Sequence, residues 1–97
     1  MKPAIFDPQA EAEFAQAVAF YRRESEALAA EFADAVELAV SFTAEHPAAG
    51  TPVRGEIRRW LVRRFPYSII YRESPPGVYI LAVAHQRQRP EYWSDRT

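Results

Sequence analysis

The sequence predicts an α+β fold, with a helical hairpin packed on one face of an antiparallel sheet in a single domain over residues 1–97. Two observations predict it. Residues 8–45 carry apolar side chains at helical spacing in two runs, and residues 57–84 hold three runs rich in β-branched and aromatic residues. A chain of 97 residues has room for one domain with one modest core. The expected order is therefore strand, helix, helix and three strands.

The first helix is expected after a short strand over residues 2–6. Asp7 stands where a helix N-cap belongs, and Pro8 has the backbone angle and the missing N–H that suit the first helical position. The apolar residues that follow recur three and four positions apart, which places them on one face of the helix: Ala10, Phe14, Ala17, Val18 and Tyr21.

The second helix is expected from Glu26 to about Glu45, with Ser25 as its N-cap and Pro47 and Gly50 beyond its end. Its apolar residues also share one face: Leu28, Phe32, Ala35, Val36, Ala39 and Phe42. Because each helix is apolar on one face only, both need a flat surface to pack against, and a sheet supplies it.

Three strands are expected over residues 57–64, 67–72 and 78–84. Pro66 separates the first two, and the turn sequence Ser-Pro-Pro-Gly precedes the third. The third run is apolar almost throughout, which is typical of a central strand covered on both faces. Pro90 prevents a simple continuation of this strand into the polar tail.

Composition excludes several classes of protein. The chain has no cysteine, so disulfide scaffolds, thiolate zinc sites and cysteine nucleophiles are excluded. His46 and His85 lack the spacing of metal ligands, and no cofactor or metal is expected. No apolar run approaches the roughly 20 residues of a membrane span, and the N-terminus lacks the apolar stretch of a signal peptide. We therefore expect a soluble, cytoplasmic protein.

The charges divide along the chain. Residues 1–49 carry three basic and nine acidic side chains, whereas residues 50–97 carry nine arginines and four acidic side chains. Arginine suits bidentate contacts with carboxylate or phosphate, so the second half could hold an interaction surface. Alternatively, the acidic helices pair with the basic strands inside one fold. The sequence leaves both interpretations open.

Two stretches of the second half carry recognisable motifs. They are Arg58-x-Trp60-x-Val62-x-Arg64-Phe65-Pro66-Tyr67-x-Ile69-x-Tyr71-Arg72 and Ile80-Leu81-Ala82-Val83-Ala84-His85-x-Arg87-x-Arg89-Pro90-x-Tyr92-Trp93-x-x-Arg96. With the order of elements and the length, they make the chain resemble the RelE/ParE superfamily, the toxins of bacterial type II toxin–antitoxin modules. The Arg-Phe-Pro-Tyr sequence and the tail look more like the ParE branch than the RelE branch.

The resemblance implies a toxin that is neutralised by a cognate antitoxin in a hetero-oligomer. A ParE-like toxin would inhibit DNA gyrase. The alternatives are a RelE-like endonuclease, with the ribosome and mRNA as partners, or a degenerate toxin that only binds its antitoxin.

The residues favour a binding protein over a nuclease. RelE-like toxins use basic residues on the sheet and a tyrosine near the C-terminus. Arg87 falls on the late-strand arginine and Arg59 or Arg63 on the mid-sheet one, but the tyrosine position is Trp93, whose indole exchanges no proton near neutral pH. Thr51-Pro52-Val53-Arg54 replaces the lysine pair of the RelE branch. If the chain were a nuclease, the catalytic candidates would be His85, Arg87 and Tyr92.

Contacts with the antitoxin or the target are expected from arginines and one tryptophan: Arg58, Arg59, Arg63, Arg87, Arg89 and Trp93. Adjacent arginines on a strand point to opposite faces, so they cannot all share one surface. Tyr92 and Trp93 could stack on nucleotides, or they could fold back over the sheet as a clasp, which is the interpretation favoured for Trp93. An acidic, hydrophobic antitoxin segment is expected to fold along the arginine-bearing sheet, in contact with Arg58, Arg87 and Arg89.

Overall fold

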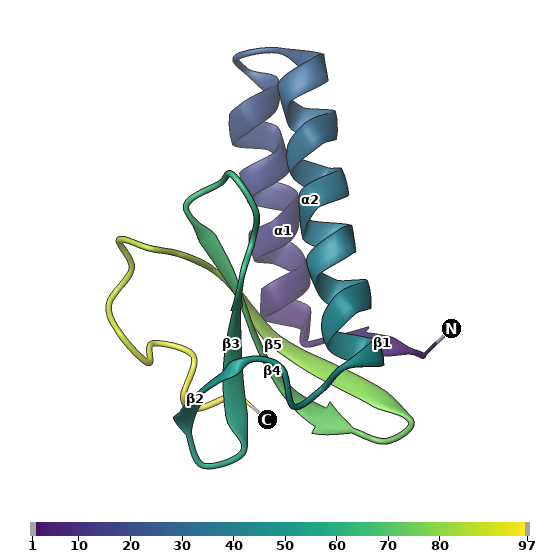
Figure 1. Cartoon of the computed structure of the whole chain (residues 1–97). Helices are drawn as coiled ribbons and strands as arrows, with labels where there is room; N and C mark the ends of the chain where they lie inside the picture. Colours follow the sequence, from purple (N-terminus) through teal and green to yellow (C-terminus); the bar gives the residue numbers. More distant parts are fainter. Residues whose placement is uncertain (1, 97) are drawn as a thin grey trace.

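The computed structural model describes residues 2–96 and confirms the α+β architecture, with a helical hairpin against one face of a sheet (Figure 1). The elements, in chain order, are β1 (Ala4–Phe6), α1 (Pro8–Arg22), α2 (Glu26–Glu45), β2 (Thr51–Arg54), β3 (Ile57–Leu61), β4 (Tyr67–Ser74) and β5 (Gly77–His85).

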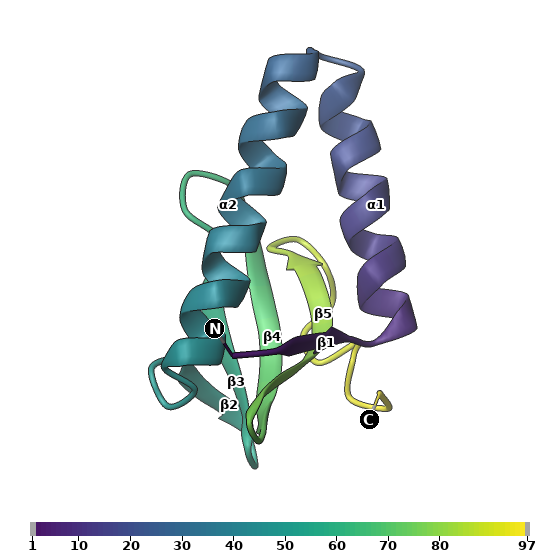
Figure 2. The same ribbon diagram turned by 90° about the vertical axis from the view of Figure 1, so that its right-hand side faces the viewer.

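Both helices begin at the residues that the sequence indicates. An oxygen of the Asp7 carboxylate accepts a hydrogen bond from the backbone N–H of Gln9 at 2.8 Å, and the Ser25 hydroxyl accepts one from the N–H of Leu28 at 2.9 Å. These side chains satisfy N–H groups that have no partner within the helix. The two helices are closest at their shared tip and diverge toward β1 (Figure 2). In the described part of the chain, neither helix is long and apolar enough to cross a membrane.

The sheet has the strand order β1-β5-β4-β3-β2 and is mixed, which corrects the expected antiparallel sheet. β2 to β5 form a meander in which each strand reverses the direction of the one before. β1 instead pairs in parallel with β5, in a register that sets Ala4 against Val78. The helical hairpin separates β1 from the meander in the chain, so no tight turn forces β1 to run antiparallel to its neighbour.

Strand β2 was not among the expected elements. Its Pro52 cannot donate to a ladder, and such residues occur on edge strands, which is where β2 lies. β3 ends at Leu61, three residues earlier than expected, because the chain turns through residues 62–66 and Arg64 adopts a left-handed backbone conformation with φ of 73°.

The main core lies between the hairpin and the sheet. Its centre is Phe32 of α2, which is fully buried and lies 5.1 Å from the ring of Phe65 and 5.0 Å from that of Tyr67. Other members come from both helices, from the turn after β3, and from β4 and β5: Ala10, Ala17, Val36, Ala39, Val40, Ala44, Val62, Ile69, Tyr71, Val78, Ile80 and Val83.

A second, smaller cluster covers the far face of the sheet, which confirms that β5 is covered on both sides. It contains Ile70, Leu81, Ala82, Ala84 and Trp93. Trp93 belongs to residues 86–96, the segment after β5, which we call the C-terminal strap because it returns across this face (Figure 1). The register sets Ile70 against Ala82 but Tyr71 against Ile80, so Leu81 is a bulge residue and both Leu81 and Ala82 join the far cluster.

Candidate functional site

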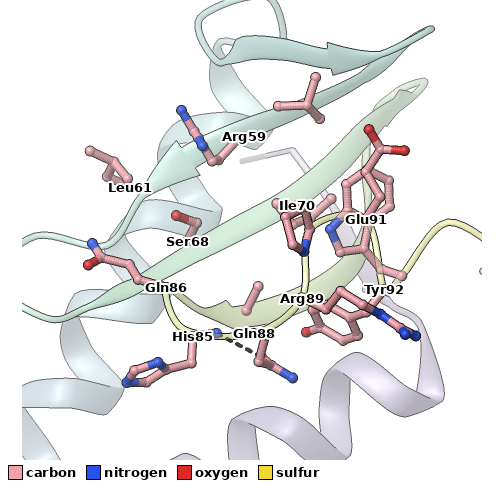
Figure 3. A pocket seen from close by; sticks show the side chains of 14 residues that line it. Arg59, Leu61, Ser68, Ile70, His85, Gln86, Gln88, Arg89, Glu91 and Tyr92 are labelled. Carbon is pink, nitrogen blue, oxygen red and sulfur yellow. Dashed lines mark hydrogen bonds between the residues drawn. The ribbon is translucent and has the colours of Figure 1, made fainter.

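A groove of about 520 Å³ opens on the face of the sheet that is turned away from the helices. β3 forms one wall, the C-terminal strap forms the other, and β4 with the end of β5 forms the floor (Figure 3). We call it the sheet groove. The aliphatic part of its lining comes from Val53, Ile70, Ala84 and the 60% exposed Leu61.

Ser68 is the polar residue that β4 contributes to the floor. Only 7% of the residue is exposed. Ser68 alternates with Ile69 along β4, so its side chain is on the groove side while Ile69 enters the main core. Figure 3 shows the hydroxyl standing out from β4 into the groove.

Arg59 and Arg89 supply the positive charge of the sheet groove. Arg59 comes from β3 and Arg89 from the strap, and neither guanidinium makes an ion pair within the described chain. Glu91 also lines the groove, but its carboxylate accepts a hydrogen bond from Arg54 at 2.7 Å. The groove therefore presents two arginines without carboxylate partners on different walls.

The half-buried side chain of Arg58 is bonded to the backbone of a neighbouring loop. It pairs with Tyr71 across the sheet, whereas the adjacent Arg59 pairs with Ile70, so the two arginines point to opposite faces as expected. The Arg58 guanidinium donates to the carbonyl oxygen of Gly50 at 2.8 Å, and the Tyr71 hydroxyl donates to that of Pro47 at 2.8 Å. These bonds fix the loop between α2 and β2, which indicates a structural role for Arg58.

The C-terminal strap is tied to α1 by one carboxylate. Glu13 accepts hydrogen bonds from the N–H of Val83 at 3.0 Å, from the Tyr92 hydroxyl at 2.9 Å, and from both terminal nitrogens of Arg96 at 3.0 and 2.9 Å. Arg96 also donates to the carbonyl oxygen of Leu81, the bulge residue, at 3.0 Å. We call Glu13, Tyr92 and Arg96 the Glu13 latch.

The latch fixes the protonation states of Tyr92 and Arg96. Burial, and then the hydrogen bond and negative charge of Glu13, raise the pKa of Tyr92 far above its usual value, so the phenol stays neutral and donates. Burial acts to lower the pKa of Arg96, but the bond to Glu13 and its charge outweigh burial and raise this pKa. A phenol that is neutral and already bonded to Glu13 is poorly suited to act as a general base.

His85 lies at the end of β5 and points away from Ser68 and Arg59 (Figure 3). Its Nδ1 accepts a hydrogen bond from the backbone N–H of Arg87 at 3.0 Å, and its ring packs edge-on against Tyr67, with centroids 5.0 Å apart. His85 thus bonds locally at the end of its strand. Of the nuclease candidates, His85 and Tyr92 line the groove and Arg87 does not, and the Tyr92 hydroxyl is already bonded to Glu13.

Trp93 is 4% exposed and packs in the far cluster, which is the clasp arrangement that the sequence favoured. Arg63 and Arg87 are exposed but lie outside the lining of the groove. Of the residues expected to contact a partner, the groove therefore collects Arg59 and Arg89, and Trp93 supports it from beneath.

Sequence reasoning missed Ser68 and Glu13. Ser68 interrupts an otherwise apolar strand, and an isolated hydroxyl at one alternate position is the signal that could have revealed it. Glu13 stands next to the apolar stripe of α1, four residues before the buried Ala17. An acidic residue at the border of a buried stripe indicates a carboxylate with a nearby cation.

A second cleft, of about 540 Å³, lies between α1 and α2 above β1, and we call it the hairpin cleft. Apolar side chains line most of it: Ala4, Phe6, Phe14, Val40 and Ala44. Glu11 of α1 and Glu37 of α2 are the acidic residues of its lining, and both are exposed. The acidic half of the chain thus surrounds an apolar cleft, which lies on the opposite side of the sheet from the sheet groove.

The fold and the groove define a small α+β protein, in which a helical hairpin covers one face of a mixed sheet and the other face carries arginines that have no ion pair within residues 2–96. The chain belongs to the ParE toxin family, because residues 4–90 match the family model described as ParE toxin of type II toxin-antitoxin system, parDE.

A solved structure described as a chromosomal ParDE TA system from P. aeruginosa has the same fold, with a TM-score of 0.74 at 18% sequence identity. The match covers 88% of this chain and 96% of that one. No curated protein sequence gives a significant match.

Proposed function

We propose that this chain is a toxin that inhibits DNA gyrase in the cytoplasm by binding rather than by catalysis, and that a cognate antitoxin neutralises it. The observation that carries the proposal is the hydrogen bond of 2.9 Å that the Tyr92 hydroxyl, in the lining of the sheet groove, donates to Glu13. Family membership supports the toxin role, and the state of the groove argues against an RNA-cleaving one.

Cleavage of RNA by such a groove needs a base for the 2′-hydroxyl and an acid for the leaving oxygen, each within hydrogen-bond reach. The Tyr92 hydroxyl already donates a hydrogen bond to Glu13, and the His85 side chain points away from Ser68. Arg59 and Arg89 remain, and arginine stabilises negative charge but does not exchange protons near neutral pH. The groove is therefore better equipped to bind an anionic partner than to move a proton.

The two clefts support an antitoxin as the second partner. The hairpin cleft is apolar with exposed carboxylates, and the sheet groove is aliphatic with unpaired arginines. A flexible chain that covered both would bury apolar surface on both sides of the sheet, which is the main source of affinity in such interfaces. The acidic hairpin and the basic sheet would each meet complementary charge on this partner.

Two parallel assays of antitoxin-free toxin test the proposal. One follows supercoiling of plasmid DNA by gyrase, and the other follows cleavage of mRNA on programmed ribosomes. We expect loss of supercoiling with intact message, and the same result for Tyr92→Phe and His85→Gln. Cleaved message with normal supercoiling would overturn the proposal, and loss of that cleavage in Tyr92→Phe would assign the nuclease role to this phenol.

A further inference from the structure

We propose that the sheet groove binds an extended, acidic and aliphatic segment of the antitoxin, with Arg59 and Ser68 holding one carboxylate and Arg89 holding another. The choice of the antitoxin as the source rests on the proposed function, whereas the chemistry of the groove rests on its own geometry. The groove would then be a second contact region, separate from the hairpin cleft on the other side of the sheet.

Ser68 shows that the groove is suited to an anion. Its hydroxyl stands out from the floor of the groove, where this donor is available to a ligand (Figure 3). A carboxylate in the groove would accept a hydrogen bond from this hydroxyl and, at the same time, hydrogen bonds from the N–H groups of Arg59.

The charge of the groove selects an acidic ligand. Glu91 is the acidic residue of the lining, and its carboxylate is engaged by Arg54. Arg59 and Arg89 thus face the groove without a carboxylate of their own in the described chain. Their positions on β3 and on the strap suit a ligand that reaches from one wall to the other (Figure 3).

The aliphatic residues that line the groove favour a peptide over a nucleic acid as its ligand. Proteins bind single-stranded nucleic acids largely by stacking bases on exposed aromatic faces. Here Trp93 is 4% exposed, and the guanidinium of Arg96 lies over the Tyr92 ring at 5.0 Å from its centroid. Leu61, at 60% exposed, and Ile70 instead offer aliphatic contact. Leu, Val or Ile side chains of an extended segment would cover this surface while its carboxylates meet the arginines.

The chemistry is tested first with the toxin alone. A nine-residue peptide of alternating glutamate and valine is titrated into labelled toxin and followed by NMR, beside a glutamine–valine peptide and a uridine hexanucleotide. We expect the glutamate peptide to shift the signals of Ser68 and Arg59, and the glutamine peptide to bind at least tenfold more weakly. Binding of the oligonucleotide alone, equal binding of both peptides, or no binding at all would overturn the proposal.

Variants locate the peptide within the toxin. Arg59→Gln with Ser68→Ala should weaken the glutamate peptide at least tenfold, and neither change removes a bond that holds the fold. Arg23→Gln, at the tip of the hairpin, is the matched control because it removes an equal charge far from the groove. Equal losses in the variant and the control would indicate non-specific charge attraction and overturn the assignment.

The source of the segment is tested with the antitoxin encoded beside the toxin. Adding Arg89→Gln to the double variant should weaken antitoxin binding at least tenfold by calorimetry, whereas Arg23→Gln should not. Unchanged affinity would overturn the antitoxin as the occupant of the groove. If the wild-type toxin itself binds no antitoxin, then the proposed neutralisation fails, and the peptide titration still decides the chemistry of the groove.

Discussion

The two faces of the sheet are covered in different ways. On the helix side, apolar side chains from two helices and the sheet fill the space. The single ring of Phe32 contacts the rings of Tyr21, Phe65 and Tyr67. On the far side, the small cluster around Trp93 is bordered by an open groove, and the strap that covers it is held by hydrogen bonds to Glu13.

The difference shows how one small sheet can provide both stability and a binding surface. Apolar packing is non-directional and grows with buried area, so the helix face stabilises the whole fold. Hydrogen bonds to one carboxylate are directional and local, so the Glu13 latch positions the strap without filling the space beneath it. The groove exists because the far face is covered only in part.

The largest effect is expected from the helix face. Phe32→Ala removes a fully buried ring and leaves a cavity, so the free energy of unfolding should fall by about 3–5 kcal/mol in urea denaturation. Leu38→Ala, on the same helix at 72% exposed, is the control and should change it by less than about 0.5 kcal/mol. Similar losses in the two variants would contradict the assignment of the core to this face.

A smaller and more local effect is expected from the latch. Glu13→Gln removes the charge that pairs with Arg96, whose side chain is 10% exposed, and should lower the free energy of unfolding by about 1.5–3 kcal/mol. Hydrogen exchange of the Val83 amide should accelerate, while that of the hairpin core stays slow. Glu24→Gln, exposed between the helices, is the matched control. An unchanged Val83 amide would show that the strap does not depend on Glu13.

The smallest effect is expected from Tyr92→Phe, which removes one donor of the latch and should cost about 0.5–1.5 kcal/mol near neutral pH. Since the folded pKa of Tyr92 lies above its unfolded value, the unfolded phenol ionises first. The contribution is therefore full below pH 10.0, the ordinary value, and is lost as the pH rises through the folded pKa. Denaturation of the wild-type protein and of Tyr92→Phe from pH 7 to 11 should show the difference between their free energies of unfolding becoming smaller at the alkaline end. A difference that does not change with pH would contradict the bond to Glu13.

Much of the fold could be predicted from local signals. Asp7 and Ser25 cap the helices as expected because capping depends on residues within one turn of each other. The covered strand β5 was equally evident from its continuous apolar run. Strand β2 was not, because Pro52 and its polar neighbours weaken the pattern of an edge strand.

The candidate site was predictable only in part. The arginine-rich second half of the chain predicted a cationic surface, but not which arginines share it. Alternation along β3 separates Arg58 from Arg59, and Arg58 then bonds to the loop before β2. Arg89 meets Arg59 in one groove because the strap folds back over the far face. That return depends on a contact between Glu13 and Arg96, which lie 83 residues apart in the chain.

The sequence by itself determined the fold class, the helix starts, the division of charge and the resemblance to ParE toxins, because each depends on periodicity or on short motifs. Only the tertiary structure decided the parallel pairing of β1, the bulge at Leu81, the place of Ser68 in the groove and the engagement of Tyr92. These features arise where segments distant in the chain meet, and no local pattern records which buried polar group finds a partner.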